Sequence, residues 1–438
     1  MPAVTTETFV PPVPLRAENT GLDFGFLVDL AMKTVYADAN CTTERAAQKL
    51  KLSMPITEGL LQHLYHEKLI EIRGLVSFGN NRYGMLDRGW QRAQQLLGLN
   101  GYIGPAPVSL PAYIEMVLRQ SAARDPIQPE AVHSSLSELV LPDTTIQTLG
   151  LVANSRRSLF MTGPAGNGKT TIATALHKAQ QGDIWIPYAV EVDGQIIKIF
   201  DSHNHHPVTA DNIPTDALGQ YDERWVRINR PIVIVGGEMT IDTMDLIYSQ
   251  SAKFYEAPFQ MKANGGTLVI DDFGRQRVDP HELLNRWIVP LEGKVDYLTL
   301  HTGKKIEVPF EQMLIFATNL DPAALVDDAF LRRMGYRLYI NPPDHAAYAK
   351  IFKQYAEANG FEYDPSDLAY VFQLYAADSR PLRGCEPRDL LQRCSDMCNY
   401  ENRPKVLSEE LLHAAWAKYF GAAPDIQQRD DAQFLEAR

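Results

Sequence analysis

The chain has 438 residues, 45% of them hydrophobic, and a formal net charge of -12 at pH 7. This length predicts two or three domains, and no apolar stretch approaches a membrane span, so we expect a soluble protein with no membrane partner. The acidic total disfavours a protein whose main task is to coat nucleic acid and favours protein partners, although a local basic face is compatible with it. Four cysteines without a paired Cys-x2-Cys spacing predict neither a zinc site nor a disulfide framework.

The first residues of the chain are rich in proline and threonine. Residues 1–24 include Glu7 and Glu18 and do not resemble a secretory signal. We interpret this segment as a disordered tail and expect a cytoplasmic protein.

Residues 25–100 are predicted to run helix, helix, helix, two strands, helix. Thr42 or Thr43 is positioned to cap a helix over 44–50, and apolar residues spaced by three and four follow Ser53. A strand pair on either side of a Gly-Asn-Asn loop and a last helix complete the order. This order resembles a winged-helix domain, which is an α+β unit.

Winged-helix domains often bind DNA, so the charges of this one are informative. Residues 25–100 contain nine Lys and Arg and seven Asp and Glu, so the segment is nearly neutral. The helix that would enter a groove presents Glu58 outward and ends at Glu67, and carboxylates near phosphates reduce affinity. We therefore expect docking of an unidentified protein partner, with DNA binding as the alternative.

Residues 101–134 are predicted to be a linker, because Pro105, Pro107 and Pro111 interrupt regular structure. A short helix is expected within this linker at 112–122.

From about residue 135 strands and helices alternate, which predicts a parallel sheet covered by helices on both faces over residues 135–343. Apolar runs predict strands at 158–161, 231–235, 267–270 and 313–317. Between the first two runs, 184–200 is expected to form a β-hairpin with Asp193-Gly194 at its turn, and 201–221 an exposed loop.

A Gly-x4-Gly-Lys-Thr loop lies between the first of these strands and a helical stretch. Its glycines let backbone N–H groups face phosphates, the lysine supplies a mobile cation, and the threonine offers a hydroxyl to Mg²⁺. The residues predicted to bind the nucleotide are Gly163, Pro164, Ala165, Gly166, Asn167, Gly168, Lys169, Thr170 and Thr171. The pattern predicts ATP with Mg²⁺ as the cofactors.

Two further strands end in polar residues that suit the same chemistry. Asp271 follows an apolar strand and is expected to hold Mg²⁺ together with Thr170, while Asp272 is placed to orient or deprotonate the attacking water. Asn319 follows another apolar strand and is expected to hydrogen-bond the water or the γ-phosphate. Glu238 ends a third strand and is either a switch residue or a solvated turn.

These motifs, in this order, resemble the AAA+ ATPases. Lys169, Asp271 with Asp272, and Asn319 match that family's Walker A, Walker B and sensor-1 positions. The resemblance covers roughly residues 135–420 and implies an α/β P-loop module, with a parallel sheet flanked by helices and followed by a helical lid. It also implies an ATP-hydrolysing homo-oligomer, expected to be a hexameric ring.

The resemblance extends to arginines that would complete the site. Residues 329–337 resemble the segment that gives an arginine finger to the neighbouring subunit, with Arg333 first and Arg332 and Arg337 as alternatives. A planar guanidinium can stabilise the negative charge that phosphoryl transfer spreads over the γ-phosphate oxygens. Arg388 matches the sensor-2 arginine and would approach the phosphate from the same chain.

The C-terminal residues are predicted to form the helical lid over 344–421, as four helices, followed by a tail over 422–438. The segments 265–268, 283–287 and 336–338, the last followed by Pro342-Pro343, look similar to those of bacterial enhancer-binding activators and MoxR-like proteins. The Gly-Ala-Phe-Thr-Gly-Ala loop that those activators use on sigma factor is not found in the sequence. His203, His205 and His206 are interpreted as residues of a hydrophilic loop rather than as a metal site.

One departure from the family pattern concerns catalysis. Asp272 stands where the family usually has glutamate, so its carboxylate is withdrawn by about 1.5 Å, a displacement that can slow a reaction about a hundredfold. Three functions stay open: a ring ATPase that remodels or moves a macromolecule, a DNA-binding ATP-dependent regulator, and a slowly hydrolysing nucleotide switch.

Overall fold

The computed structural model describes residues 10–209, 221–325, 328–362 and 364–421. The predicted tail over 422–438, residues 1–9 of the predicted N-terminal tail and residues 210–220 of the predicted exposed loop lie outside them. Among the described residues, no helix has the length and apolar character needed to cross a bilayer.

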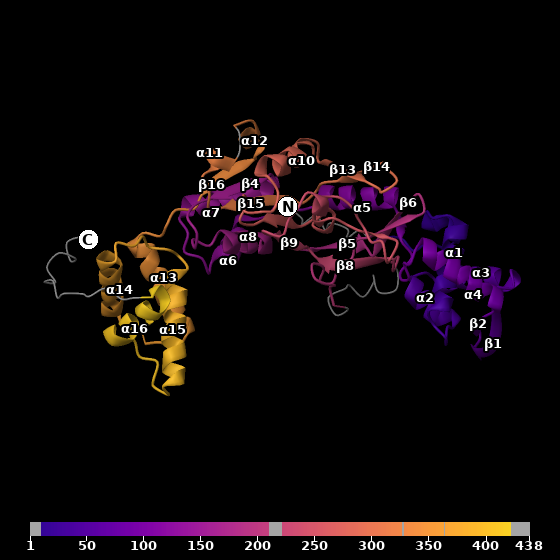
Figure 1. Ribbon diagram of the computed structural model, residues 1–438, viewed down its shortest axis with the longest axis horizontal. Helices are drawn as coiled ribbons and strands as arrows, with labels where there is room; N and C mark the ends of the chain where they lie inside the picture. The colour runs from indigo at the N-terminus through magenta and orange to yellow at the C-terminus, as the bar shows by residue number, and fades with distance from the viewer. Residues whose placement is uncertain (1–9, 210–220, 326–327, 363, 422–438) are drawn as a thin grey trace, which may run out of the picture.

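A five-stranded, fully parallel sheet forms the centre of the molecule (Figure 1). Its strands, in spatial order, are β16 (Tyr336–Tyr339), β4 (Leu159–Thr162), β15 (Met313–Thr318), β12 (Thr267–Ile270) and β9 (Ile232–Val235). All four strands predicted from apolar runs are present. The predicted α/β P-loop fold is thus confirmed: β4, which leads into the glycine loop, lies between β15 and β16, with β12 one strand further on.

Helices cover both faces of this sheet, because alternate residues of each strand point to opposite sides. On one face Phe160 and Phe316 pack against Trp287 of α10 (Pro280–Gly293). Residues next to these along the strands, such as Met161, point to the opposite side and pack on the other face. The helices of that second face are α6 (Pro129–Leu136), α7 (Asp143–Ser155) and α8 (Lys169–Lys178).

A second sheet is assembled from segments that are distant in sequence. Its strands, in spatial order, are β10 (Ile247–Tyr248), β11 (Tyr255–Glu256), β7 (Gln195–Lys198), β6 (Ala189–Val192) and β3 (Val108–Ser109). The predicted hairpin is present as β6 and β7, with Asp193 and Gly194 both at positive φ in its turn. The start of the predicted hairpin segment differs, since β5 (Asp183–Pro187) pairs with β8 (Trp225–Asn229). A third pair joins β13 (Val295–Thr299) to β14 (Lys305–Pro309).

The segment expected to be a linker is part of this second core. Its helix α5 (Leu110–Ala122) buries Tyr113, Met116 and Val117 in the core that it shares with β3, β5, β6 and β14. The prolines at its N-terminal side suited a linker, yet Pro111 occupies the first turn of α5, where proline is tolerated.

The N-terminal unit has the predicted element order. Its elements are α1 (Phe24–Tyr36), α2 (Thr43–Leu50), α3 (Met54–His66), β1 (Ile70–Ser77), β2 (Asn80–Met85) and α4 (Asp87–Leu99). Thr42 caps α2 by accepting a hydrogen bond from the Arg45 amide. The predicted tail ends earlier than expected, because η1 (Ala17–Thr20) is formed and Leu22 is buried in the core of this unit.

Four helices follow the central sheet, as predicted. They are α13 (His345–Ala358), α14 (Pro365–Ala377), α15 (Glu386–Tyr400) and α16 (Glu409–Phe420). Tyr348, Leu391 and Trp416 are fully buried among them, so this helical unit has a core of its own. Shorter elements complete the described fold: η3 (Asp242–Met244), α9 (Phe259–Lys262), α11 (Pro322–Leu325) and α12 (Asp328–Arg333).

Candidate nucleotide site

The glycine loop connects β4 to α8 at the carboxyl end of the sheet. Gly163, Gly166 and Gly168 have φ values of +140°, +82° and +79°, which side-chain-bearing residues rarely adopt. The Lys169 ammonium lies inside the turn, donating hydrogen bonds to the carbonyls of Gly163 (2.8 Å) and Pro164 (3.0 Å). Both hydrogen-bond acceptors of the Lys169 ammonium are therefore neutral carbonyls, and a phosphate can take their place.

Burial lowers the pKa of the Lys169 ammonium, while the nearby carboxylates of Asp271 and Asp272 raise it. An ammonium held in a partly desolvated site interacts strongly with an incoming anion, because solvent screens it less. This electrostatic setting suits a phosphate ligand.

The two residues predicted to hold Mg²⁺, Thr170 and Asp271, are in direct contact. The Thr170 hydroxyl donates to the Asp271 carboxylate at 2.7 Å, although 101 positions separate the two residues. Hydroxyl and carboxylate oxygens are the ligands that Mg²⁺ takes beside a bound polyphosphate. Among the described residues, no cluster of three or more His, Cys, Asp or Glu side chains is arranged to hold a metal ion.

Two buried amide groups point to a missing polar partner at this edge. The Asn167 side-chain nitrogen, in the loop, and the Asn319 side-chain oxygen, just after β15, have no hydrogen-bond partner. Buried polar atoms are rarely left unpaired, so a ligand or water fits here. Asn319 is held close to the site because its neighbour Thr318 donates to the Phe273 carbonyl at 2.7 Å.

Asp272 occupies a strained backbone position. Its φ of +47° is unusual for a residue other than glycine, and its amide donates to the Asp271 carboxylate at 3.0 Å. Gln276 holds this turn by donating to the Asp271 carbonyl and accepting from the Gly274 amide. Sequence reasoning missed Gln276, since a glutamine six positions after a strand carries no recognisable signal.

The helical unit contacts the glycine loop directly. The Cys385 amide donates to the Gly166 carbonyl at 2.8 Å, and the Gly384 amide donates to the Asn167 side-chain oxygen at 3.2 Å. A Cβ on Gly166 would lie 2.7 Å from the Cys385 sulfur and 3.7 Å from a side-chain carbon of Arg383. Arg383 therefore lies beside the glycine loop, and sequence reasoning missed it.

Arg388 was predicted to approach the γ-phosphate from this chain. Its guanidinium pairs with Asp389 on the same helix at 2.9 Å, and this hydrogen bond raises the pKa of Arg388. Asp389 also accepts from the Tyr419 hydroxyl. The role of Arg388 at the phosphate stays a prediction.

Two of the three candidate finger arginines, Arg332 and Arg333, lie near the amino ends of the central strands, whereas Arg337 is the second residue of β16. Arg332 and Arg333 precede β16, and β16 runs parallel to β4, so they sit near the amino ends of the strands while the loop sits at the carboxyl ends. Arg333 pairs with Glu292 at 2.6 Å, and Arg337 donates to the Leu331 carbonyl. The placement before β16 separates Arg332 and Arg333 from the loop of their own chain.

Glu238 has local hydrogen bonds that suit a turn. Its carboxylate accepts from the Gly236 amide at 3.0 Å, and this bond lowers the pKa of Glu238. The predicted loop histidine His205 is buried, accepts from the Asp201 amide and bonds the Lys262 carbonyl through its other ring nitrogen. Burial lowers the pKa of His205, so its neutral form has a structural role.

Comparisons with known proteins give limited likeness. Residues 344–418, which span nearly all of the four C-terminal helices, match a family described as Domain of unknown function (DUF8689). None of the curated proteins matches the chain.

Solved structures resemble the chain at low identity. NtrX from Brucella abortus in complex with ATP is similar at 17% identity and a TM-score of 0.39, over 62% of this chain and 55% of that chain. The RuvB Holliday junction branch migration motor from Thermotoga maritima is similar at 14% identity and a TM-score of 0.36, over 67% of this chain and 70% of that chain. The match thus spans little more than half of the NtrX chain.

Proposed function

We propose that the chain is an AAA+ ATPase that binds ATP with Mg²⁺ in the loop over residues 163–171 and hydrolyses it. The observation that carries this proposal is the bond between Thr170 and Asp271, beside a lysine that occupies the turn with only carbonyl partners. Phosphoryl transfer depends on positioning and on electrostatic stabilisation, and this edge of the sheet offers both.

Each residue has a defined part in the reaction. Lys169 neutralises phosphate charge, Asp271 and Thr170 hold Mg²⁺, and Asp272 orients the attacking water. Asn319 supplies an unpaired amide oxygen that can accept a hydrogen bond from that water. Mg²⁺, when bound, neutralises charge on the phosphate oxygens.

The placement of the arginines supports assembly into a ring. Arg332 and Arg333 lie near the amino ends of the strands, away from the loop of their own chain, which suits action on a nucleotide held by another copy. Head-to-tail contact of this kind closes into a ring when the rotation between copies is right, and we propose a hexamer.

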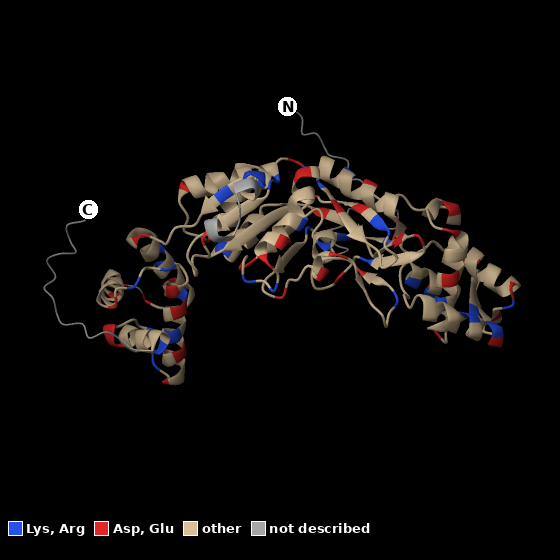
Figure 2. Ribbon diagram, turned by 45° about the horizontal axis from the view of Figure 1, so that its top comes forward, with Lys and Arg blue, Asp and Glu red and all other residues tan. Residues whose placement is uncertain are grey.

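The N-terminal unit is proposed to recruit the partner. The β1–β2 hairpin exposes Leu75 (72% exposed), Val76 and Phe78, which is an apolar surface. Figure 2 shows basic and acidic residues interspersed over this unit, and exposed apolar side chains on a hairpin suit a protein partner better than a phosphate backbone. We therefore propose a protein as the molecule that the ring moves or remodels.

The test is ATP turnover per chain, measured over a wide range of protein concentration for the wild type, Arg333→Ala and Glu292→Ala. We expect turnover to rise with concentration in the wild type and to fall about a thousandfold in Arg333→Ala, which is the scale of a lost arginine finger. Glu292→Ala is the matched control: it breaks the same ion pair and leaves the arginine in place, so its turnover should persist. Equal loss in both variants would mean that the pair is structural, and turnover independent of concentration would contradict the ring.

A second candidate function is a nucleotide switch that binds ATP and hydrolyses it slowly. The positive φ of Asp272, together with its short side chain, favours this candidate, because both displace the carboxylate that must meet the water. Lengthening this side chain distinguishes the two functions.

A further inference from the structure

A basic cavity of about 430 Å³ lies beneath the amino ends of the central strands. Its wall comes from the turn before β4, the end of α10, the approach to β15 and the residues before β16. This volume is within the range of about 300–1,000 Å³ that ligand sites occupy. We call it the basic cavity.

The charge of the lining is of one sign. The cations that line the basic cavity are Arg156, Arg157, Lys294, Arg332 and Arg333, and no carboxylate of the described residues lines it. Glu292, outside the lining, pairs with Arg333. The remaining cations attract an anion from outside the chain, and a concave low-dielectric wall strengthens that attraction.

A second observation points to a ligand with hydrogen-bonding groups. Gln312 lines the basic cavity and is 2% exposed, yet neither its amide nitrogen nor its amide oxygen has a partner. Gln180, which is similarly buried, accepts from Arg124 and donates to Thr267. Leaving both ends of a buried amide unpaired is costly, so Gln312 is suited to a ligand edge that both donates and accepts.

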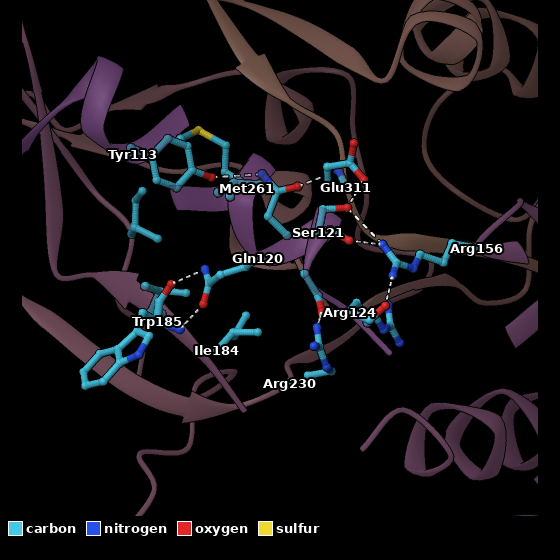
Figure 3. Close-up of a pocket in the computed structure, with 15 residues that line it drawn as sticks. Tyr113, Gln120, Ser121, Arg124, Arg156, Ile184, Trp185, Arg230, Met261 and Glu311 are labelled. Atoms are coloured by element: carbon cyan, nitrogen blue, oxygen red, sulfur yellow. Dashed lines mark hydrogen bonds between the residues drawn. The ribbon is translucent and has the colours of Figure 1, made fainter. Parts of the chain in front are cut away.

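The neighbouring hollow shows what an internally satisfied arginine cluster looks like (Figure 3). There Arg156 donates to the carbonyl and hydroxyl of Ser121, Arg124 to Gln180, and Arg230 to the Gly265 carbonyl. That hollow measures about 20 Å³, which is room for a water molecule and no more. Arg156 lines both spaces, and its bonds to Ser121 hold its guanidinium in place.

We propose that the basic cavity binds a nucleotide. Its phosphates would contact Arg157 and Lys294, and its base would lie on the apolar part of the wall, formed by Leu291, Phe310 and Met334, with its edge against Gln312. A nucleotide base has adjacent donor and acceptor atoms, as a carboxamide requires. The nucleotide is either free or held in the glycine loop of a second copy, and the second source rests on the proposed function.

The experiment measures binding of labelled ATP to the full-length chain by equilibrium dialysis, at dilute and at associating concentrations. The cavity variant is Arg157→Gln with Lys294→Gln, which keeps both side-chain stems and removes both charges. The matched control removes two exposed cations far from the cavity, Arg73→Gln with Lys353→Gln. Each pair is made in the wild type and in Lys169→Ala, where the glycine loop is disabled.

For a free nucleotide, Lys169→Ala should keep one ATP site, and the cavity variant should weaken that site about tenfold while the control does not. For a nucleotide held by a neighbour, Lys169→Ala should keep only the loop site, with an ATP affinity about a hundredfold below that of the wild type. With the loop intact, the cavity variant should then lower ATP affinity about tenfold only where chains associate. ATP affinities equal to the control in both backgrounds and at every concentration would overturn the proposal. ATP binding by the wild type tests the proposed function separately.

Gln312→Met tests whether the ligand is a nucleotide. ATP should bind the variant more weakly, while inorganic tripolyphosphate, which has no base, should bind as it does to the wild type. An unchanged ATP affinity at the cavity in Gln312→Met would overturn the assignment to a nucleotide.

Discussion

The carboxyl ends and the amino ends of the central strands, called here the carboxyl edge and the amino edge, differ in the charges that they carry. At the carboxyl edge Lys169 lies near Asp271 and Asp272, and Thr170 already donates to Asp271, so charges of both signs are present within one chain. At the amino edge the basic cavity gathers cations with no carboxylate in its described lining. The difference teaches that the first edge is prepared for a ligand that brings both an anion and a metal ion, while the second is prepared for an anion alone.

Helix ends explain how the amino edge tolerates its cations. Arg156 and Lys294 are the C-cap residues of α7 and α10, and Arg333 lies in the last turn of α12. The negative end of a helix dipole stabilises a nearby cation by about 0.3–1 kcal/mol, which partly replaces a carboxylate. The dipoles account for the cations, but they do not account for the unpaired amide of Gln312.

The largest expected effect is on ATP affinity and comes from a substitution at the carboxyl edge alone. Lys169→Ala should weaken ATP binding at the loop about a hundredfold, because a charge-assisted contact to phosphate is lost. Its ligand-free thermal stability should change little, since the ammonium donates only to loop carbonyls. Titration calorimetry and thermal unfolding check the two parts. A large loss of ligand-free stability with unchanged ATP affinity would show that Lys169 only holds the turn together.

An intermediate effect, on kcat, is expected from substitutions of Asp272 at the carboxyl edge. Asp272→Glu extends the carboxylate toward the expected water, so kcat should rise about tenfold with ATP affinity unchanged. Asp272→Asn is the control: asparagine tolerates the positive φ but has no carboxylate, so it should bind ATP and lose turnover. Steady-state kinetics measure both variants. A slower Glu variant would mean that the wild-type aspartate is correctly placed, and an active Asn variant would remove Asp272 from the catalytic role.

The parts that sequence predicted are those with local signals. The glycine loop needs positive φ at fixed positions, and the buried strands need continuous apolar runs, so both were found from residue types alone. The second sheet joins β3, β6 and β11 across more than a hundred positions, and no local pattern announces such pairing. The contact of Cys385 with Gly166 was likewise invisible, because it depends on how the helical unit meets the loop.

The smallest expected effect concerns stability at the amino edge. Gln312→Met replaces an unpaired buried amide by an apolar chain of similar shape, so the ligand-free protein should gain about 1 kcal/mol, seen as a rise of about 2–4 °C in Tm by calorimetry. Gln180→Met is the matched control, since it removes bonds to Arg124 and Thr267 and should lower Tm. If both variants lose stability alike, the Gln312 amide has partners in solution. A gain in Gln312→Met alone would show that this glutamine costs the free protein stability, which is expected of a side chain kept for a ligand rather than for the fold.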